Sequence, residues 1–159
     1  MQEREGMFMD ALTLLKNDHT KVKGLFKEVE ALGDRATSDR GRLFKEIDRE
    51  LRLHSEAEEK IFYPAFKQHA ENNEEREEVA EAYEEHAIVA NLIGEIEGLE
   101  PSDEQYKAKL NVMIELVKHH ADEEENIMFK EARELFDQSE LEQLGEKIAR
   151  FKEQAKAPA

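Results

Sequence analysis

Four histidines and two glutamates interrupt stripes of apolar residues that otherwise recur every three or four positions. That spacing buries one face of an α-helix, so these polar side chains are expected to point into a helical core. Two of the histidines have glutamate four residues later, which places an imidazole and a carboxylate on the same helix face, one turn apart. The candidate residues are His19, His54, Glu58, His86, His120 and Glu124.

Such a set of side chains has the chemistry of a dinuclear metal site. Imidazole binds zinc, copper and iron, whereas carboxylates favour harder ions and can bridge two of them. Each ion would take two histidines from two helices, and Glu58 and Glu124 would bridge the pair. Two divalent ions against two carboxylates leave room for a bridging oxide or hydroxide, and for a small ligand such as O₂. Metal binding should weaken as acid protonates the imidazoles, whose reference pKa is about 6.5.

The spacing alone is weak evidence, because glutamate is abundant in this acidic chain. The buried position is stronger evidence, since six unpartnered polar groups would cost more than a domain can spare. A metal-free hydrogen-bonded network, or a plain interaction bundle, stays open as the alternative. His120 continues the apolar stripe better than its neighbour His119, and His69 is expected at the surface. Glu59 and Glu123 are expected to point off the stripes.

Loop-forming residues predict helices near 10–32, 40–70, 74–98, 103–136 and 140–155. Capping boxes at Ser102 and Ser139 are expected to begin the last two helices. Pro64 is expected to kink the helix near 40–70 by displacing the carbonyl of Lys60. The expected fold is all-α: an antiparallel up-down-up-down four-helix bundle with a short C-terminal fifth helix. Residues 1–9 would be a lead, 10–136 the bundle, and 137–159 the short helix and tail. All four histidines would lie ~18–27 Å from the same end of the bundle.

The chain also contains an internal repeat. Residues 18–32 align with 85–99, and residues 54–64 align with 120–130, so that His19 matches His86 and His54 matches His120. Each half therefore supplies one helix with a histidine and one helix with His-x-x-x-Glu. Two such halves would face each other across a pseudo-twofold axis.

Composition excludes several classes of protein. The 159 residues carry a formal charge of −16, which disfavours nucleic acid and anionic membranes as partners. The absence of cysteine excludes disulfides, thiolate metal sites and iron–sulfur clusters. The chain begins without the pattern of a secretory signal, and no apolar run reaches the ~18–20 residues that span a bilayer. A cytoplasmic protein is expected, with its protein partners unknown.

With these residues in place, the sequence resembles a hemerythrin-like, HHE cation-binding domain over most of residues 10–136. The family pattern of His, His-x-x-x-Glu, His and His-x-x-x-Glu falls on the six candidate residues, and EEKIFYP at 58–64 is similar to the family's run after the second histidine. Oxygen-carrying hemerythrins have a further histidine one turn from His86, where this chain has Ala82 and Ala90. Tyr83 is the nearest polar aromatic residue in the sequence.

The resemblance implies a non-haem di-iron protein that binds or senses O₂ through a carboxylate-bridged histidine site. The cofactor would be two iron ions bridged by oxo or hydroxo, with zinc or manganese open as alternatives. Peroxide or nitric oxide handling, and iron storage or sensing, are the competing functions, and small anions such as azide are possible ligands. Whether the protein is an enzyme stays open.

Overall fold

The computed structural model describes residues 9–156, and within that range the secondary structure is entirely helical, as expected. None of the described helices is long and apolar enough to cross a membrane. Most of the expected N-terminal lead lies outside the described residues. The elements are α1 (Ala11–Glu30), α2 (Thr37–Ala57), the π-helical turn η2 (Glu58–Phe62), α3 (Tyr63–His69), α4 (Asn73–Glu97), α5 (Glu104–Glu123), the π-helical turn η3 (Glu124–Met128), α6 (Phe129–Leu135) and α7 (Gln138–Lys156).

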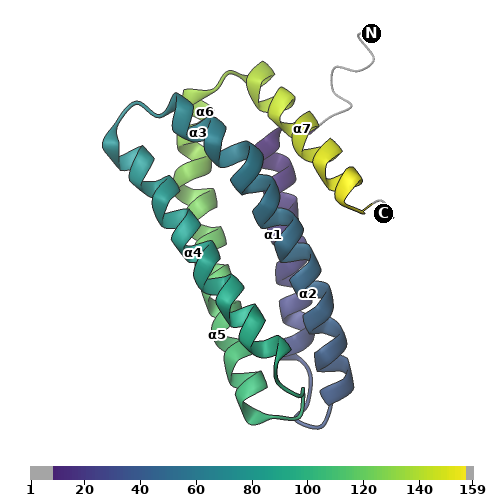
Figure 1. The fold of residues 1–159 in the computed structure, drawn as a ribbon. Helices are drawn as coiled ribbons and strands as arrows, with labels where there is room; N and C mark the ends of the chain where they lie inside the picture. The colour runs from purple at the N-terminus through teal and green to yellow at the C-terminus, as the bar shows by residue number, and fades with distance from the viewer. Residues whose placement is uncertain (1–8, 157–159) are drawn as a thin grey trace.

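Long helical segments lie side by side in Figure 1: α1, α2 continuing into α3, α4, and α5 continuing into α6. The connections after α1 and α4 lie at the lower end of the view, and the one after α3 lies at the upper end. Helix α1 packs against α2, and α4 packs against α5. Helix α7 crosses the upper part of the molecule and packs against α1 and α2.

Aspartate side chains cap the last two long helices, so the predicted serine caps at Ser102 and Ser139 are wrong. Asp103 caps α5 with its carboxylate, which accepts a backbone N–H of the first turn. At α7, Asp137 and Glu140 each accept the other's backbone N–H, which is a capping box beginning two residues before the expected serine.

The second long helix begins earlier than predicted, at Thr37 rather than near residue 40. Arg40 lies within its first turns and is buried, and its guanidinium Nη2 donates to the carbonyl oxygen of Gly33 at 2.9 Å. This bond holds the short loop after α1 against the new helix, which explains why the loop is shorter than the run of turn-forming residues indicates.

Both His-x-x-x-Glu helices widen into a π-helical turn that begins at the glutamate. The N–H of Tyr63 bonds to the carbonyl of Glu58, and the N–H of Phe129 bonds to the carbonyl of Glu124. Pro64 follows the first turn, but the second turn forms with Lys130 at the matching position. The irregularity is therefore a property of both repeats, and the predicted proline kink does not account for it. π-Turns inside α-helices are frequent at functional sites.

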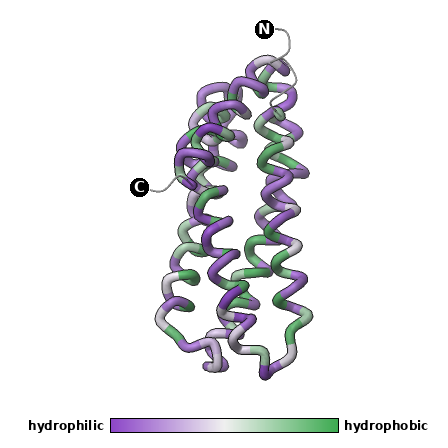
Figure 2. Tube along the Cα trace, turned by 90° about the vertical axis from the view of Figure 1, so that its right-hand side faces the viewer, coloured by the Kyte–Doolittle hydropathy of each residue, from purple (hydrophilic) through white to green (hydrophobic). Residues whose placement is uncertain are grey.

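Two apolar cores fill the described part of the molecule, one toward each end. Figure 2 shows hydrophobic and hydrophilic residues interleaved along every helix, as expected when one face of each is buried. The first core is centred on α3, α6 and α7 and includes Phe62, Phe66, Phe129 and Ile148. The second lies between the lower parts of α1, α2, α4 and α5 and includes Phe26, Ile47, Ile96 and Leu110.

Helix α7 approaches the start of α1 so closely that only glycine fits at the crossing. A Cβ atom added to Gly145 would lie 2.1 Å from the carbonyl oxygen of Met9 and 2.9 Å from the backbone carbon of Asp10. Beside it, Leu141, Leu144 and Ile148 are buried in the first core. Apolar burial and backbone contact together dock α7.

Gly145→Ala should destabilise the protein by about 1–3 kcal/mol, because the added methyl forces the two backbones apart. Gly94→Ala in α4 is the matched control, since nothing lies within 4 Å of its Cβ position. The control should be neutral or stabilise by up to about 1 kcal/mol, as alanine favours helix over glycine. Urea unfolding of both variants measures the difference. Equal effects of the two substitutions would contradict the close approach.

Candidate metal centre

The structure brings all six candidate residues together between the two apolar cores. Each helix of the bundle positions one histidine, and both glutamates stand at the first position of a π-turn. Two groups of side chains could each hold a metal ion, with their donor atoms within 4.8 Å of one another, and Glu58 belongs to both. The first group is His19, His54, Glu58 and Glu124; the second is Glu58, His86 and His120.

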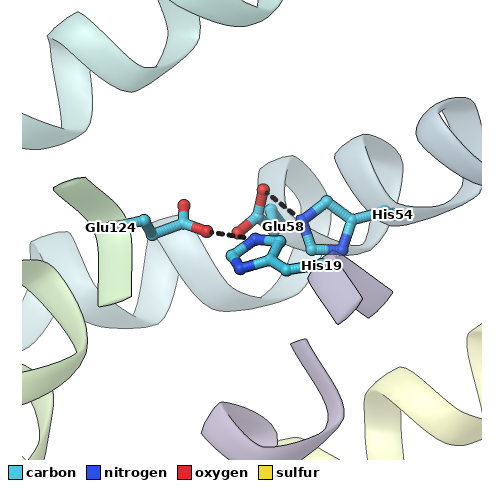
Figure 3. Close-up of side chains that lie close together, drawn as sticks. All are labelled: His19, His54, Glu58 and Glu124. Carbon is cyan, nitrogen blue, oxygen red and sulfur yellow. Dashed lines mark ion pairs between the residues drawn. The ribbon is translucent and has the colours of Figure 1, made fainter. Parts of the chain in front are cut away.

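In the first half of the site, two imidazoles face two carboxylates (Figure 3). The Nε2 atom of His19 lies 3.1 Å from Glu124 Oε1, and that of His54 lies 3.1 Å from Glu58 Oε1. The two imidazole rings meet edge to face with their centres 4.9 Å apart. All four side chains are buried, and Glu58 is completely so.

The second half repeats this arrangement. The Nε2 atom of His86 lies 3.2 Å from Glu58 Oε1, and that of His120 lies 3.5 Å from Glu124 Oε2. Their ring centres are 5.0 Å apart. Each glutamate therefore faces one histidine of each half, which is the placement that a bridging carboxylate requires.

Every histidine of the site also contacts a second carboxylate through its other ring nitrogen. The Nδ1 distances are 2.6 Å for His19 to Glu125, 2.8 Å for His54 to Asp18, 2.8 Å for His86 to Glu59 and 2.7 Å for His120 to Glu85. Such partners orient an imidazole and make its inward nitrogen a better ligand. The expectation that Glu59 points away from the site is wrong, because Glu59 reaches across to a histidine of another helix.

The buried carboxylates determine the charge of the histidines. Burial alone would lower the pKa of His54, but Glu58 and Asp18 raise it to about 10. For His120, bonds to Glu124 and Glu85 outweigh burial and raise the pKa to about 11. Burial would raise the pKa of Glu58, yet His54 and His86 hold it well below its usual value. Without metal, His54 and His120 are therefore charged at neutral pH, and Glu58 stays ionised between His54 and His86.

Tyr63 also lies in the site, although the spacing of its neighbours in the sequence does not indicate this. Its hydroxyl donates to Glu124 Oε2 at 2.5 Å and lies 3.1 Å from Glu58 Oε1. It also lies 3.3 Å from His86 Nε2. Tyr83, by contrast, is partly exposed and bonds to the backbone of Glu59. Of the two alanines beside His86, Ala82 is buried on the side of Tyr63 whereas Ala90 is exposed.

Removing the Tyr63 hydroxyl should destabilise the metal-free protein, because a buried carboxylate would lose its donor. We expect Tyr63→Phe to lower the free energy of unfolding by about 1–3 kcal/mol. Tyr83→Phe removes a hydroxyl bond at the surface and should cost less than about 1 kcal/mol. Denaturant unfolding of both metal-free variants checks the order, and an equal loss in both would contradict a buried role for Tyr63.

The inward-facing atoms fit a metal ion better than they fit each other. His19 Nε2, His54 Nε2, Glu58 Oε2 and Glu124 Oε1 are buried and form no aligned hydrogen bond. Buried polar atoms are rarely left in this state, so their convergence calls for a shared partner. Four imidazoles and two carboxylates suit a transition metal.

A small cavity of about 40 Å³ lies against the four imidazoles, on the side of the second core. Most of its exposed lining is apolar. One water needs about 10–15 Å³, so the cavity has room for a molecule of a few atoms. The space therefore suits a small ligand beside the imidazoles, with Asp18, Lys23 and Glu85 also at its edge. Its apolar walls include Val22, Leu51, Val89, Val117 and Ala121.

Two other histidines lie outside the cluster. His119 is exposed and pairs with Glu123 on the surface at 3.2 Å, so His120 rather than His119 occupies the inward position. His69 is half-buried rather than fully at the surface. Its ring packs on Phe136, and its Nε2 lies 2.9 Å from Glu140 at the start of α7.

The chain matches the family model of the hemerythrin HHE cation binding domain over residues 10–132. Among solved structures, it is similar to the crystal structure of a hemerythrin HHE cation binding domain-containing protein from Mycobacterium kansasii, a homologue of Rv2633c. The TM-score is 0.78 at 30% sequence identity, covering 92% of this chain and 86% of the other.

Two curated relatives are similar over most of this chain. Rv2633c of Mycobacterium tuberculosis is 28% identical over 144 residues, which are 89% of this chain and 84% of that protein. A DNA nickase of Nostoc sp. is 26% identical over 135 residues, which are 85% of this chain. The matched region is only 37% of the nickase, so this chain resembles one part of that larger protein.

Proposed function

Because the chain belongs to the hemerythrin HHE cation-binding domain family, we propose that its six-residue cluster binds two iron ions and that the loaded protein binds or senses O₂. The observation that carries the proposal is the placement of Glu58 and Glu124, each facing one histidine of each half. A single ion would leave one of these halves without a partner. Bound iron would supply redox chemistry toward O₂ or a related small molecule.

The protein's own residues prepare the site for this role. The outer carboxylates, Asp18, Glu59, Glu85 and Glu125, contact the Nδ1 atoms and so hold each Nε2 toward the centre of the cluster. The Tyr63 hydroxyl donates a hydrogen bond that holds Glu124 in place, and burial together with Glu124 and Glu58 raises its pKa so that it keeps its proton. The two apolar cores exclude water on either side of the cluster.

The apolar cavity beside the imidazoles supports an uncharged diatomic ligand. O₂ and nitric oxide lose little on leaving water, so they suit the mostly apolar exposed surface of this cavity, which the four imidazoles also border. Peroxide handling is the second candidate function. The observation that favours it is the Tyr63 hydroxyl, a hydrogen-bond donor buried directly beside both glutamates.

The first experiment is metal analysis of protein purified without added metal, followed by anaerobic loading with Fe(II). Two irons per chain support the proposal, whereas saturation at one ion, or a resident zinc or manganese, contradicts it.

The loaded, reduced protein is then mixed with O₂, nitric oxide or peroxide and followed by stopped-flow absorbance. An O₂-dependent spectrum that reverses under argon supports binding or sensing. Consumption of peroxide over many turnovers supports the second candidate.

We also propose that the four long helical segments form an up-down-up-down bundle over residues 10–136, and that residues 137–159 add a separate C-terminal element. Connections at alternating ends support the first part. The end of the family match at residue 132, before α7 begins, supports the second. We further place the protein in the cytoplasm, in keeping with its acidic, cysteine-free composition.

A further inference from the structure

Helix α7 contacts the site through one lysine. The Nζ atom of Lys152 bonds to Asp18 Oδ2. The same oxygen accepts the Nδ1 proton of His54 at 2.8 Å. Both Lys152 and Asp18 are largely shielded from solvent, at 16% and 18% side-chain exposure. Their interaction is therefore screened less than a surface ion pair.

The other three outer carboxylates differ from Asp18 in this respect. Glu59, Glu85 and Glu125 each contact a histidine of the site, and no lysine or arginine pairs with them among residues 9–156. Glu85 is the counterpart of Asp18 in the internal repeat and bonds to His120. The repeat is thus nearly symmetric in its inward side chains and outer carboxylates, but within residues 9–156 a lysine pairs with the outer carboxylate of one half alone.

This cation comes from outside the matched family domain, which ends at residue 132. Lys152 does not dock the helix on its own. Three apolar side chains of α7 are buried, Gly145 lies against the backbone of α1, and Lys60 lies over the ring of Phe151 at 5.3 Å. Replacing Lys152 should therefore leave α7 in place, so that its electrical effect can be measured separately.

We infer that Lys152 is a positioning residue of the site, and that by sharing Asp18 Oδ2 with His54 it makes the His19/His54 half easier to reduce than the His86/His120 half. A carboxylate on Nδ1 increases electron donation from the opposite ring nitrogen to a metal. A cation on the same carboxylate oxygen opposes this effect. An ion with weaker donors favours its lower oxidation state. The inference rests on the proposed function, because it requires an ion in each half.

The test compares Lys152→Met with Lys152→Arg and with Lys147→Met in a mediated redox titration of the iron-loaded protein. Lys147 is exposed on the same helix, so its replacement removes the same net charge at a distance from the site. We expect Lys152→Met to shift the higher of two reduction steps to lower potential and to leave the other in place. Lys152→Arg and Lys147→Met should retain both original values. Asp18→Asn should weaken metal binding about 10- to 100-fold, as outer-shell partners do.

Unchanged reduction potentials in Lys152→Met would overturn the inference. An equal shift of the potential in Lys147→Met, or in Lys152→Arg, which keeps the positive charge, would overturn it as well. A second measurement separates this outcome from failure of the proposed function. In metal-free protein, the Nδ1 proton resonance of His54 should move downfield in Lys152→Met while that of His120 stays in place. If no variant takes up iron, the di-iron function and the redox inference both fail, and the resonance still decides whether Lys152 acts on His54.

Discussion

Replacing Glu58 with alanine is expected to remove both metal ions, weakening each by more than ~100-fold. Changes in outer-shell partners already cost about 10–100-fold in affinity, and Glu58 faces a histidine of each half directly. Glu124→Ala should have a similar effect, because Glu124 contacts His19 and His120. Metal content after loading and desalting is the measurement. Glu58→Gln, which keeps the shape of the side chain, should lose metal as well.

The matched control is Glu123→Ala. Glu123 precedes Glu124 in the chain but pairs with His119 on the surface, 3.2 Å away. This variant should retain two ions. Metal loss from Glu123→Ala equal to that from Glu124→Ala would instead assign the surface pair to the site. Two ions retained in Glu58→Ala would refute a bridging role. Glu59→Ala is unsuitable as a control, since Glu59 supports His86.

Metal binding at pH 7 should release at least two protons per chain. The pKa of His54 is raised to about 10 and that of His120 to about 11 by the carboxylates that contact them, so both are charged in the metal-free protein. Imidazole binds metal only when neutral, and each proton displaced makes affinity rise about tenfold per pH unit. Two protons give about 100-fold per unit between pH 7 and 10. An unperturbed histidine would make metal affinity depend on pH mainly below about 6.5. The raised pKa values move this pH range upward.

Calorimetry with Co(II) in two buffers of different ionisation enthalpy counts the released protons. His119→Ala serves as the control and should leave the count unchanged, because His119 lies at the surface. Affinity that is flat from pH 7 to 9 would contradict the prediction.

Raised histidine pKa values also stabilise the metal-free fold. This contribution is complete below the unfolded pKa of about 6.5 and is lost as pH rises through the folded values. Melting temperatures with and without metal should therefore diverge as the solution becomes alkaline.

The six-residue cluster could be predicted because all its members obey ordinary helix periodicity. His54 and Glu58, four positions apart, lie on one face whether or not the neighbouring turns are regular. Tyr63 breaks that rule. Five positions beyond Glu58, it would lie ~140° away on a regular α-helix, but the π-turn returns it to the same face. Nothing in the spacing of apolar residues indicates where a helix will widen.

The outer carboxylates could not be predicted from periodicity, because each contacts a histidine on another helix. One signal was present, however. The internal repeat places Asp18 opposite Glu85 and Glu59 opposite Glu125, so that acidic residues recur at both pairs of matched positions. Lys152 had no such signal, because α7 stands outside the repeat. Its place beside Asp18 depends on how α7 crosses α1 at Gly145.

The division of the interior into two cores has a consequence for folding cooperativity. Apolar cores normally transmit stability from one end of a domain to the other, but here they meet across a layer of charged side chains. The interactions within that layer change when metal or protons bind, whereas the packing within each apolar core does not. Occupancy of the site therefore sets how far the two ends unfold as one unit. With the layer filled, amide hydrogens at both ends should exchange through a common opening; with it empty, the end capped by α7 and the end beneath the histidines become separate exchange units.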